Sequence, residues 1–64
     1  MKLNGRNYKL KEEITVERFL ELVRIKKDCV VVEIDGEIIS NNEFSKIILN
    51  DSNAVEVISF VGGG

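Results

Sequence analysis

The chain has 64 residues, a net charge of -2 and no histidine. A chain this short forms one domain and has no room for a large internal substrate cavity. Without histidine, and with a single cysteine, it excludes a Ser-His-Asp triad, the common histidine metal sites and cysteine-rich zinc sites. The charge balance argues against nucleic-acid binding, and no apolar run reaches membrane-spanning length. We expect a small, soluble, cytoplasmic protein that is not an enzyme on its own.

The first ten residues predict a β-hairpin. Residues 1–3 form a short strand, and residues 7–10 return beside it. Asn4-Gly5 lies between them and suits a tight turn whose two central residues have positive φ.

An amphipathic helix is predicted over residues 16–26. Thr15 is a candidate N-cap, and Lys26 and Lys27 lie where the helix dipole is negative. Apolar side chains recur at helical spacing at Val16, Phe19, Leu20 and Val23, and Leu22 widens this stripe. The stripe requires a sheet face to cover it.

The second half of the chain predicts three strands. Residues 29–34 are β-branched and apolar, which is typical of an inner strand, and Asp35-Gly36 turns the chain into a short strand at residues 37–39. A short helical or irregular turn follows from Asn41. The last strand covers residues 55–61.

The order of these elements predicts an α+β fold of the ubiquitin-like β-grasp class. A single amphipathic helix must lie across one face of a sheet to bury its stripe. The hairpin, the crossover helix and the later strands then give a mixed sheet of four to five strands. We expect residues 1–61 to form this domain and residues 62–64 to form a flexible glycine tail.

Two features of the C-terminal region are candidates for function. In the last strand, Val55, Val57 and Ser59 share one face, and Glu56, Ile58 and Phe60 share the other. If the valine face meets the helix, Ile58 and Phe60 lie on the uncovered face as a partner-docking patch, although isolated exposed apolar residues are also ordinary.

The glycine tail is the second feature. Gly62, Gly63 and Gly64 lack side chains, so they could thread a narrow slot in another protein. A carboxylate becomes reactive toward nucleophiles only after activation, for instance by adenylation. Gly64 would then be a substrate of another enzyme, and the alternative is a frayed chain end.

Other polar or reactive residues have simpler interpretations. Cys29 could act as a thiolate, but a lone cysteine at the start of an apolar strand is more often a small buried hydrophobe. Glu33, Asp35 and Glu37 could form an acidic rim for a basic partner, but a solvated hairpin tip is the more common arrangement.

Nearly the whole chain resembles the ThiS family of sulfur carrier proteins of thiamin biosynthesis. The resemblance rests on residues 32–39, on Phe44 and Leu49, and on residues 55–61 followed by Gly63-Gly64. Leu3-Asn4-Gly5 and the start of the helix at Thr15-Val16 are similar as well. Asp35-Gly36 departs from the Asn-Gly that is usual in the family.

The resemblance implies a function for the C-terminus. An adenylating enzyme of the ThiF type would use ATP and Mg to form an acyl-adenylate on Gly64, and a persulfide donor would convert it to a thiocarboxylate. A thiazole synthase of the ThiG type would accept the sulfur, and the carrier itself would bind no cofactor. The alternatives are a related carrier such as the small subunit of molybdopterin synthase, a ubiquitin-like protein modifier, and an interaction module with an inert tail.

Overall fold

In a computed structural model that describes residues 1–60, the main sheet has five strands. In sequence order these are β1 (Lys2–Leu3), β2 (Arg6–Asn7), β4 (Val30–Ile34), β5 (Glu37–Ile39) and β7 (Ala54–Ser59). They lie in the order β2-β1-β7-β4-β5, with β1 parallel to β7 and the other neighbours antiparallel. The expected mixed sheet and β-grasp order are therefore confirmed.

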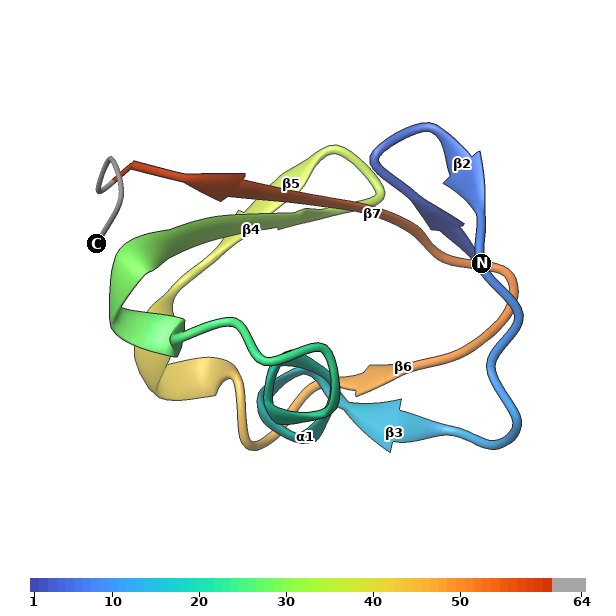
Figure 1. The fold of residues 1–64 in the computed structure, drawn as a ribbon, viewed down its shortest axis with the longest axis horizontal. Helices are drawn as coiled ribbons and strands as arrows, with labels where there is room; N and C mark the ends of the chain where they lie inside the picture. The colour runs from blue at the N-terminus through green and yellow to red at the C-terminus, as the bar shows by residue number, and fades with distance from the viewer. Residues whose placement is uncertain (61–64) are drawn as a thin grey trace.

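The helix α1 (Val16–Leu22) covers one face of this sheet (Figure 1). Beside α1 lies a second, two-stranded sheet of β3 (Ile14–Thr15) and β6 (Ile48–Leu49), which the sequence did not predict. Two short 3-10 helices, η1 (Lys27–Cys29) and η2 (Asn41–Glu43), complete the described elements. The helix and the small sheet form one layer, and the five-stranded sheet forms the other.

Both predicted hairpin turns are present. Asn4 and Gly5 have φ of 51° and 82°, and Asp35 and Gly36 have φ of 52° and 88°. Consecutive positive φ values are those of the tight turn that matches the twist of two antiparallel strands. The Asp35-Gly36 turn places β5 beside β4, and the Asn4-Gly5 turn ends β1 after only two residues.

The helix begins where predicted but ends at Leu22, earlier than expected. The Thr15 side chain accepts a hydrogen bond from the N–H of Arg18 at 3.1 Å, which confirms the N-cap. At the other end Arg24 has φ of 63°, and the N–H groups of Arg24 and Ile25 donate to the carbonyls of Glu21 and Leu20. This is the Schellman arrangement, which stops the helix at a left-handed residue that is usually glycine.

The early stop corrects two details of the predicted helix. Lys26 and Lys27 lie beyond it, and Lys27 forms an ion pair of 3.0 Å with Glu17 instead of interacting with the helix terminus. The side chain of Leu22 is 58% exposed and does not widen the core stripe.

The core lies between the sheet and α1. Its buried side chains are Leu10, Val16, Phe19, Leu20, Val30, Val32, Ile34, Phe44, Leu49 and Val55. The ring of Tyr8 packs edge-on against Phe19 with centroids 5.4 Å apart. Burial alternates along β4, with Val30, Val32 and Ile34 facing the helix, as expected for the inner strand.

The boundaries of several strands differ from the prediction. The strand expected at residues 7–10 is limited to Arg6–Asn7, because the following residues leave the sheet toward β3. Cys29 belongs to η1 and is half-buried, so it is not the first residue of the inner strand. The last strand begins at Ala54 and ends at Ser59, while Val61 and the glycines of the expected 62–64 tail lie outside the described residues.

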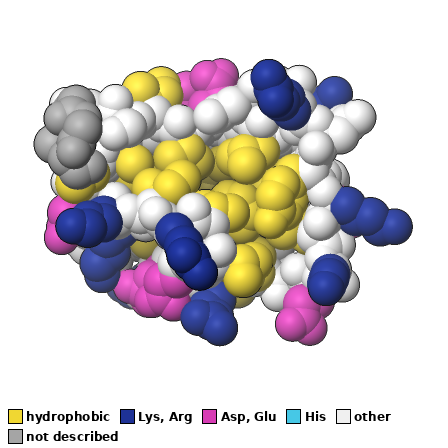
Figure 2. Space-filling model, in the orientation of Figure 1, with side chains coloured by type: hydrophobic (Ala, Val, Ile, Leu, Met, Phe, Trp, Pro, Cys, Tyr) yellow, Lys and Arg dark blue, Asp and Glu magenta, His cyan; other side chains and the backbone are white. Residues whose placement is uncertain are grey.

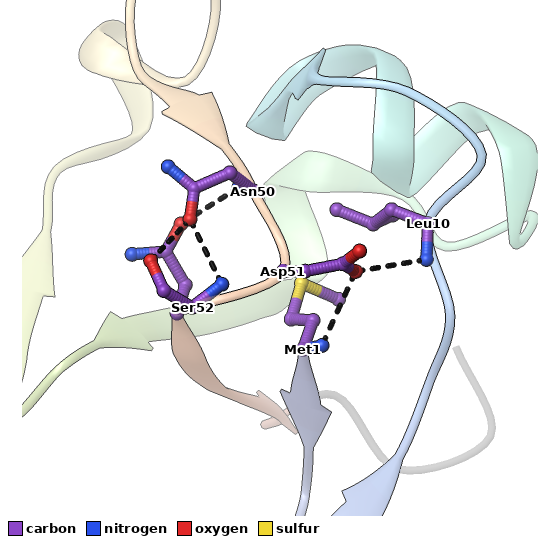
Figure 3. Close-up of polar contacts among 6 residues, drawn as sticks. Met1, Leu10, Asn50, Asp51 and Ser52 are labelled. Carbon is purple, nitrogen blue, oxygen red and sulfur yellow. Dashed lines mark hydrogen bonds and ion pairs between the residues drawn. The ribbon is translucent and has the colours of Figure 1, made fainter.

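Asp51, in the turn before β7, forms hydrogen bonds with two sites near the N-terminus (Figure 3). Its Oδ1 accepts hydrogen bonds from the N–H of Leu10 at 3.2 Å and from the terminal amine of Met1 at 3.3 Å. The bond from Leu10, followed by that from the amine, lowers the pKa of the Asp51 carboxyl below its ordinary value. The start of the chain is therefore held beside the turn that leads into β7.

Candidate functional site

The strand that leads to the C-terminus has one covered and one uncovered face. Val55 is buried against the helix and Val57 is half-buried, whereas Ile58 and Phe60 are 53% and 61% exposed. Phe60 follows the end of β7, but its N–H still donates to the carbonyl of Cys29 at 3.1 Å. The predicted division is confirmed for Val55 and Val57 against Ile58, whereas Ser59 of the valine face is itself exposed. Ile58 and Phe60 lie where a partner can reach them.

The strand register places further residues on the uncovered face. Val31 lies opposite Ile58, and Glu33 lies opposite Glu56 on one side and Ile38 on the other. Ile38 is 70% exposed, so three large apolar side chains of this region are open to solvent. The face therefore combines apolar side chains with a pair of carboxylates on adjacent strands.

The carboxylate pair differs from the acidic rim that the sequence suggested. Glu33 belongs to it, but its neighbour is Glu56, which lies far away in the sequence and was not grouped with the hairpin acids. The ion pairs found within residues 1–60 involve neither glutamate. Only the register of β4 against β7 brings the two together, so no local motif could have predicted the pair.

Asp35 has a structural role at the hairpin instead. Its Oδ1 accepts from the N–H of Ala54 and its Oδ2 from the Asn53 side chain, both at 2.8 Å. The bond from Ala54, followed by that from Asn53, lowers the pKa of the Asp35 carboxyl below its ordinary value. The carboxylate thereby fixes the start of β7 against the β4–β5 turn.

The remaining predicted functional residues are the three terminal glycines and Cys29. Gly62, Gly63 and Gly64 lie outside the described residues, so their roles stay predictions. Cys29 is half-buried beside the end of β7, so it is more exposed than the buried hydrophobe that the sequence favoured.

Within residues 1–60 there is no group of three or more side chains suited to bind a metal ion. No helix in this part of the chain is long and apolar enough to span a membrane.

Comparison with known proteins agrees with this geometry. The model of the ThiS family matches residues 1–64. The chain belongs to the ThiS family of ubiquitin-like sulfur carriers. The sulfur carrier protein ThiS of Bacillus subtilis (strain 168) is 32% identical over 65 residues, which cover 100% of this chain and 98% of that protein. The resemblance inferred from the hairpin and the Gly-Gly end is thus confirmed.

Two further proteins extend the comparison of this ThiS-family chain. The crystal structure of a thiamine biosynthesis protein (ThiS) from Geobacter metallireducens superposes with a TM-score of 0.84 at 29% identity, covering 98% of this chain and 96% of that one. A thiazole synthase of Paramagnetospirillum magneticum is 29% identical over 62 residues. That match covers 97% of this chain but only 19% of the synthase, so a carrier-like segment forms a small part of a longer polypeptide.

Proposed function

We propose that this chain carries sulfur for thiazole formation in thiamin biosynthesis, on the carboxyl group of Gly64. The observation that carries the proposal is the family match, which extends through the last glycine. Three glycines after β7 offer a terminal carboxylate without side chains around it, and such a segment can enter a narrow active site. The carrier is then a substrate at each step and needs no catalytic residue of its own.

The chemistry requires three steps that other proteins supply. An adenylating enzyme of the ThiF type joins the Gly64 carboxylate to the α-phosphate of ATP, with Mg, and releases pyrophosphate. The terminal sulfur of a persulfide attacks this acyl-adenylate and displaces AMP, which gives an acyl disulfide. A second thiol attacks the donor's sulfur of this S–S bond, forms a disulfide with it, and releases the thiocarboxylate on Gly64.

A thiazole synthase of the ThiG type is the proposed acceptor. The support is the synthase from Paramagnetospirillum magneticum, in which a segment similar to this chain belongs to the same polypeptide as the enzyme named for the thiazole. A fused carrier and acceptor are expected when one delivers sulfur to the other. The related alternatives, a molybdopterin carrier and a protein modifier, share the Gly-Gly end but require other acceptors.

The uncovered sheet face is the proposed docking surface for these enzymes. Ile58 in β7 and Phe60 directly after it supply exposed apolar area on the segment that leads to Gly64. Docking there places the tail beside the partner's active site without disturbing the core. Glu33 and Glu56 add negative charge to this face, so the complementary surface of a partner carries Lys or Arg.

Reconstitution with a purified ThiF-type enzyme tests the proposal. With MgATP and the full chain as substrate, the enzyme is expected to release pyrophosphate from ATP. With a chain that lacks Gly63 and Gly64, it is expected to release none. The truncated chain should keep the melting temperature of the full chain and its affinity for the enzyme's docking site. Equal pyrophosphate release with both chains would contradict the proposal. If the truncated chain still supported the activity of its partner enzymes, the result would favour an interaction module.

A further inference from the structure

The second half of β7 has an unpaired edge. The backbone N–H and C=O groups of successive residues point to opposite sides of the strand. Backbone groups of Ala54 and of Phe60, which follows β7, form hydrogen bonds on the β4 side, while those of Val55 and Val57 form hydrogen bonds on the β1 side. β1 reaches only Ala54 and Val55, because the chain turns away at Asn4-Gly5. Figure 1 shows β1 and β2 beside the beginning of β7 alone.

The side chain of Asn4 takes the place of one further strand residue. Its Oδ1 accepts from the N–H of Val57 at 2.8 Å, and its Nδ2 donates to the carbonyl of Val57 at 3.3 Å. The next residue that faces this edge is Ser59. Among the hydrogen bonds within residues 1–60, none pairs its backbone N–H or carbonyl on this side. An open donor and acceptor on a strand edge are a template for another strand.

A hollow of about 320 Å³ lies under the end of β7, between that strand, the start of β4 and the loop after α1, and Ser59 is part of its lining. Ile25, Val30 and Val57 give it an apolar lining, and Arg24 and Lys26 are its cations. Figure 2 shows apolar side chains gathered between β7 and α1, with basic side chains below them.

The charges and the backbone conformation beside this hollow indicate that it accepts an anionic side chain. The ion pairs within residues 1–60 use Arg18, Lys27 and the terminal amine, and they leave Arg24 and Lys26 without a carboxylate. Arg24 also holds the left-handed conformation that glycine adopts at lower cost. Residues held in sparsely populated backbone conformations cluster at ligand-binding and switch sites.

We propose that an extended segment of another protein adds to the Ser59 edge of β7 as a further strand, with a glutamate pointing into the hollow. The side chains of an added strand alternate between the two faces of the sheet. On the inner face, the stem of a glutamate lies against Ile25 and Val57, and its carboxylate lies near Arg24 and Lys26. This edge is distinct from the uncovered face of Ile58 and Phe60, so either surface can fail a test without the other.

A capped synthetic peptide, Ser-Val-Thr-Glu-Thr-Val-Ser, is the probe. We expect titration into the full, isotope-labelled chain to shift the amide signals of Ser59, Arg24 and Lys26 and to slow hydrogen exchange at Ser59. Two N-methylated versions of the peptide separate strand addition from simple charge attraction, since each blocks one set of alternate amides. One version should lose binding and the other should keep it.

Charge reversal tests the glutamate. Replacing the peptide's glutamate by lysine is expected to weaken binding about tenfold, and the double variant R24E/K26E should reverse that preference. Any of three results would overturn the proposal. These are equal binding of both N-methylated peptides, unchanged hydrogen exchange at Ser59, and binding that does not saturate at millimolar peptide. Protection of Ser59 that rises with protein concentration in the absence of peptide would also overturn it, in favour of pairing with a second copy.

Discussion

Glu33 of β4 lies directly opposite Glu56 of β7 on the uncovered face of the sheet, and no ion pair within residues 1–60 involves either carboxylate. Like charges at directly opposed positions destabilise a sheet. The chain retains them beside the exposed apolar side chains of Ile38 and Ile58. The pair adds negative charge to the face proposed for docking, where it would complement a basic partner.

The first prediction concerns this pair. Glu56→Gln removes the repulsion while keeping the size of the side chain, so it should raise the free energy of unfolding by about 0.2–1 kcal/mol in urea denaturation at low salt. The gain should shrink in high salt and should largely disappear when Glu33 is already glutamine. Glu12→Gln, in an exposed loop, is the control. A Glu56→Gln variant less stable than the parent would show that the carboxylates do not repel each other.

The second prediction concerns docking. Ile58→Asp and Phe60→Asp should each weaken binding to a ThiF-type enzyme about tenfold in calorimetry, since an apolar contact is replaced by a charge that must be desolvated. Leu22→Asp is the matched control, because Leu22 is exposed to a similar extent on the helix layer. All three variants should keep the fold. Equal affinities for the parent and the two strand variants would remove the uncovered face as the docking surface.

The third prediction concerns acid stability. The hydrogen bonds from Ala54 and Asn53 lower the pKa of Asp35 in the folded chain below its value of 3.8 in the unfolded chain. The ionised carboxylate therefore stabilises the fold above about pH 3.8, and this contribution is lost as the pH falls through the lower folded value.

The variant Asp35→Asn tests this dependence. Its free energy of unfolding should fall less steeply between about pH 5 and about pH 2 than that of the parent, because the amide does not titrate. Asp35 lies at the surface, so the difference concerns the slope and not the overall stability. Parallel curves for the two proteins over that range would contradict the role given to Asp35.

The fourth prediction concerns the end of the helix. Arg24→Gly should raise the free energy of unfolding by about 0.5–1 kcal/mol, because glycine adopts the left-handed conformation without a Cβ clash. Arg18→Gly, within α1, should lower it. Thermal or urea unfolding of the two variants measures both effects. A destabilised Arg24→Gly variant would mean that the arginine side chain itself holds the helix terminus.

The same residue explains why the sequence places the end of the helix too late. Helix ends are recognised in a sequence by glycine or proline, and an arginine at the left-handed position gives no such signal. The stripe from Val16 to Val23 is predictable because its spacing is set by the core, whereas Leu22 faces solvent although its residue type is apolar. Local spacing identifies the helix, and tertiary packing decides which residues it buries.

The other elements divide in the same way. Asn4-Gly5 and Asp35-Gly36 are local turn signals, and both turns are confirmed. In contrast, β3 and β6 have two residues each, and they pair segments that lie far apart in the sequence, with Ile14 opposite Leu49. Strands this short leave no alternating pattern to detect, so the small sheet could not be predicted.

The candidate site was predictable only where it follows from one strand. The alternation expected of the last strand predicted that Ile58 and Phe60 are uncovered, and both side chains are exposed, although β7 ends at Ser59. The opposed glutamates and the open edge at Ser59 depend on which strands are neighbours and where β1 ends. Those are properties of the assembled sheet, and no single segment of the sequence encodes them.

Top-down mass spectrometry of the protein isolated from its own host is the most direct test of sulfur carriage. Intact mass alone is insufficient, because oxidation of Met1 or Cys29 produces nearly the same nominal shift as exchange of oxygen for sulfur. Fragmentation must therefore assign the change to a residue. We expect a fraction of the molecules to carry sulfur in place of oxygen on Gly64. A terminus that remains a plain carboxylate, even after incubation with an adenylating enzyme, MgATP and a persulfide donor, would contradict sulfur carriage by this chain.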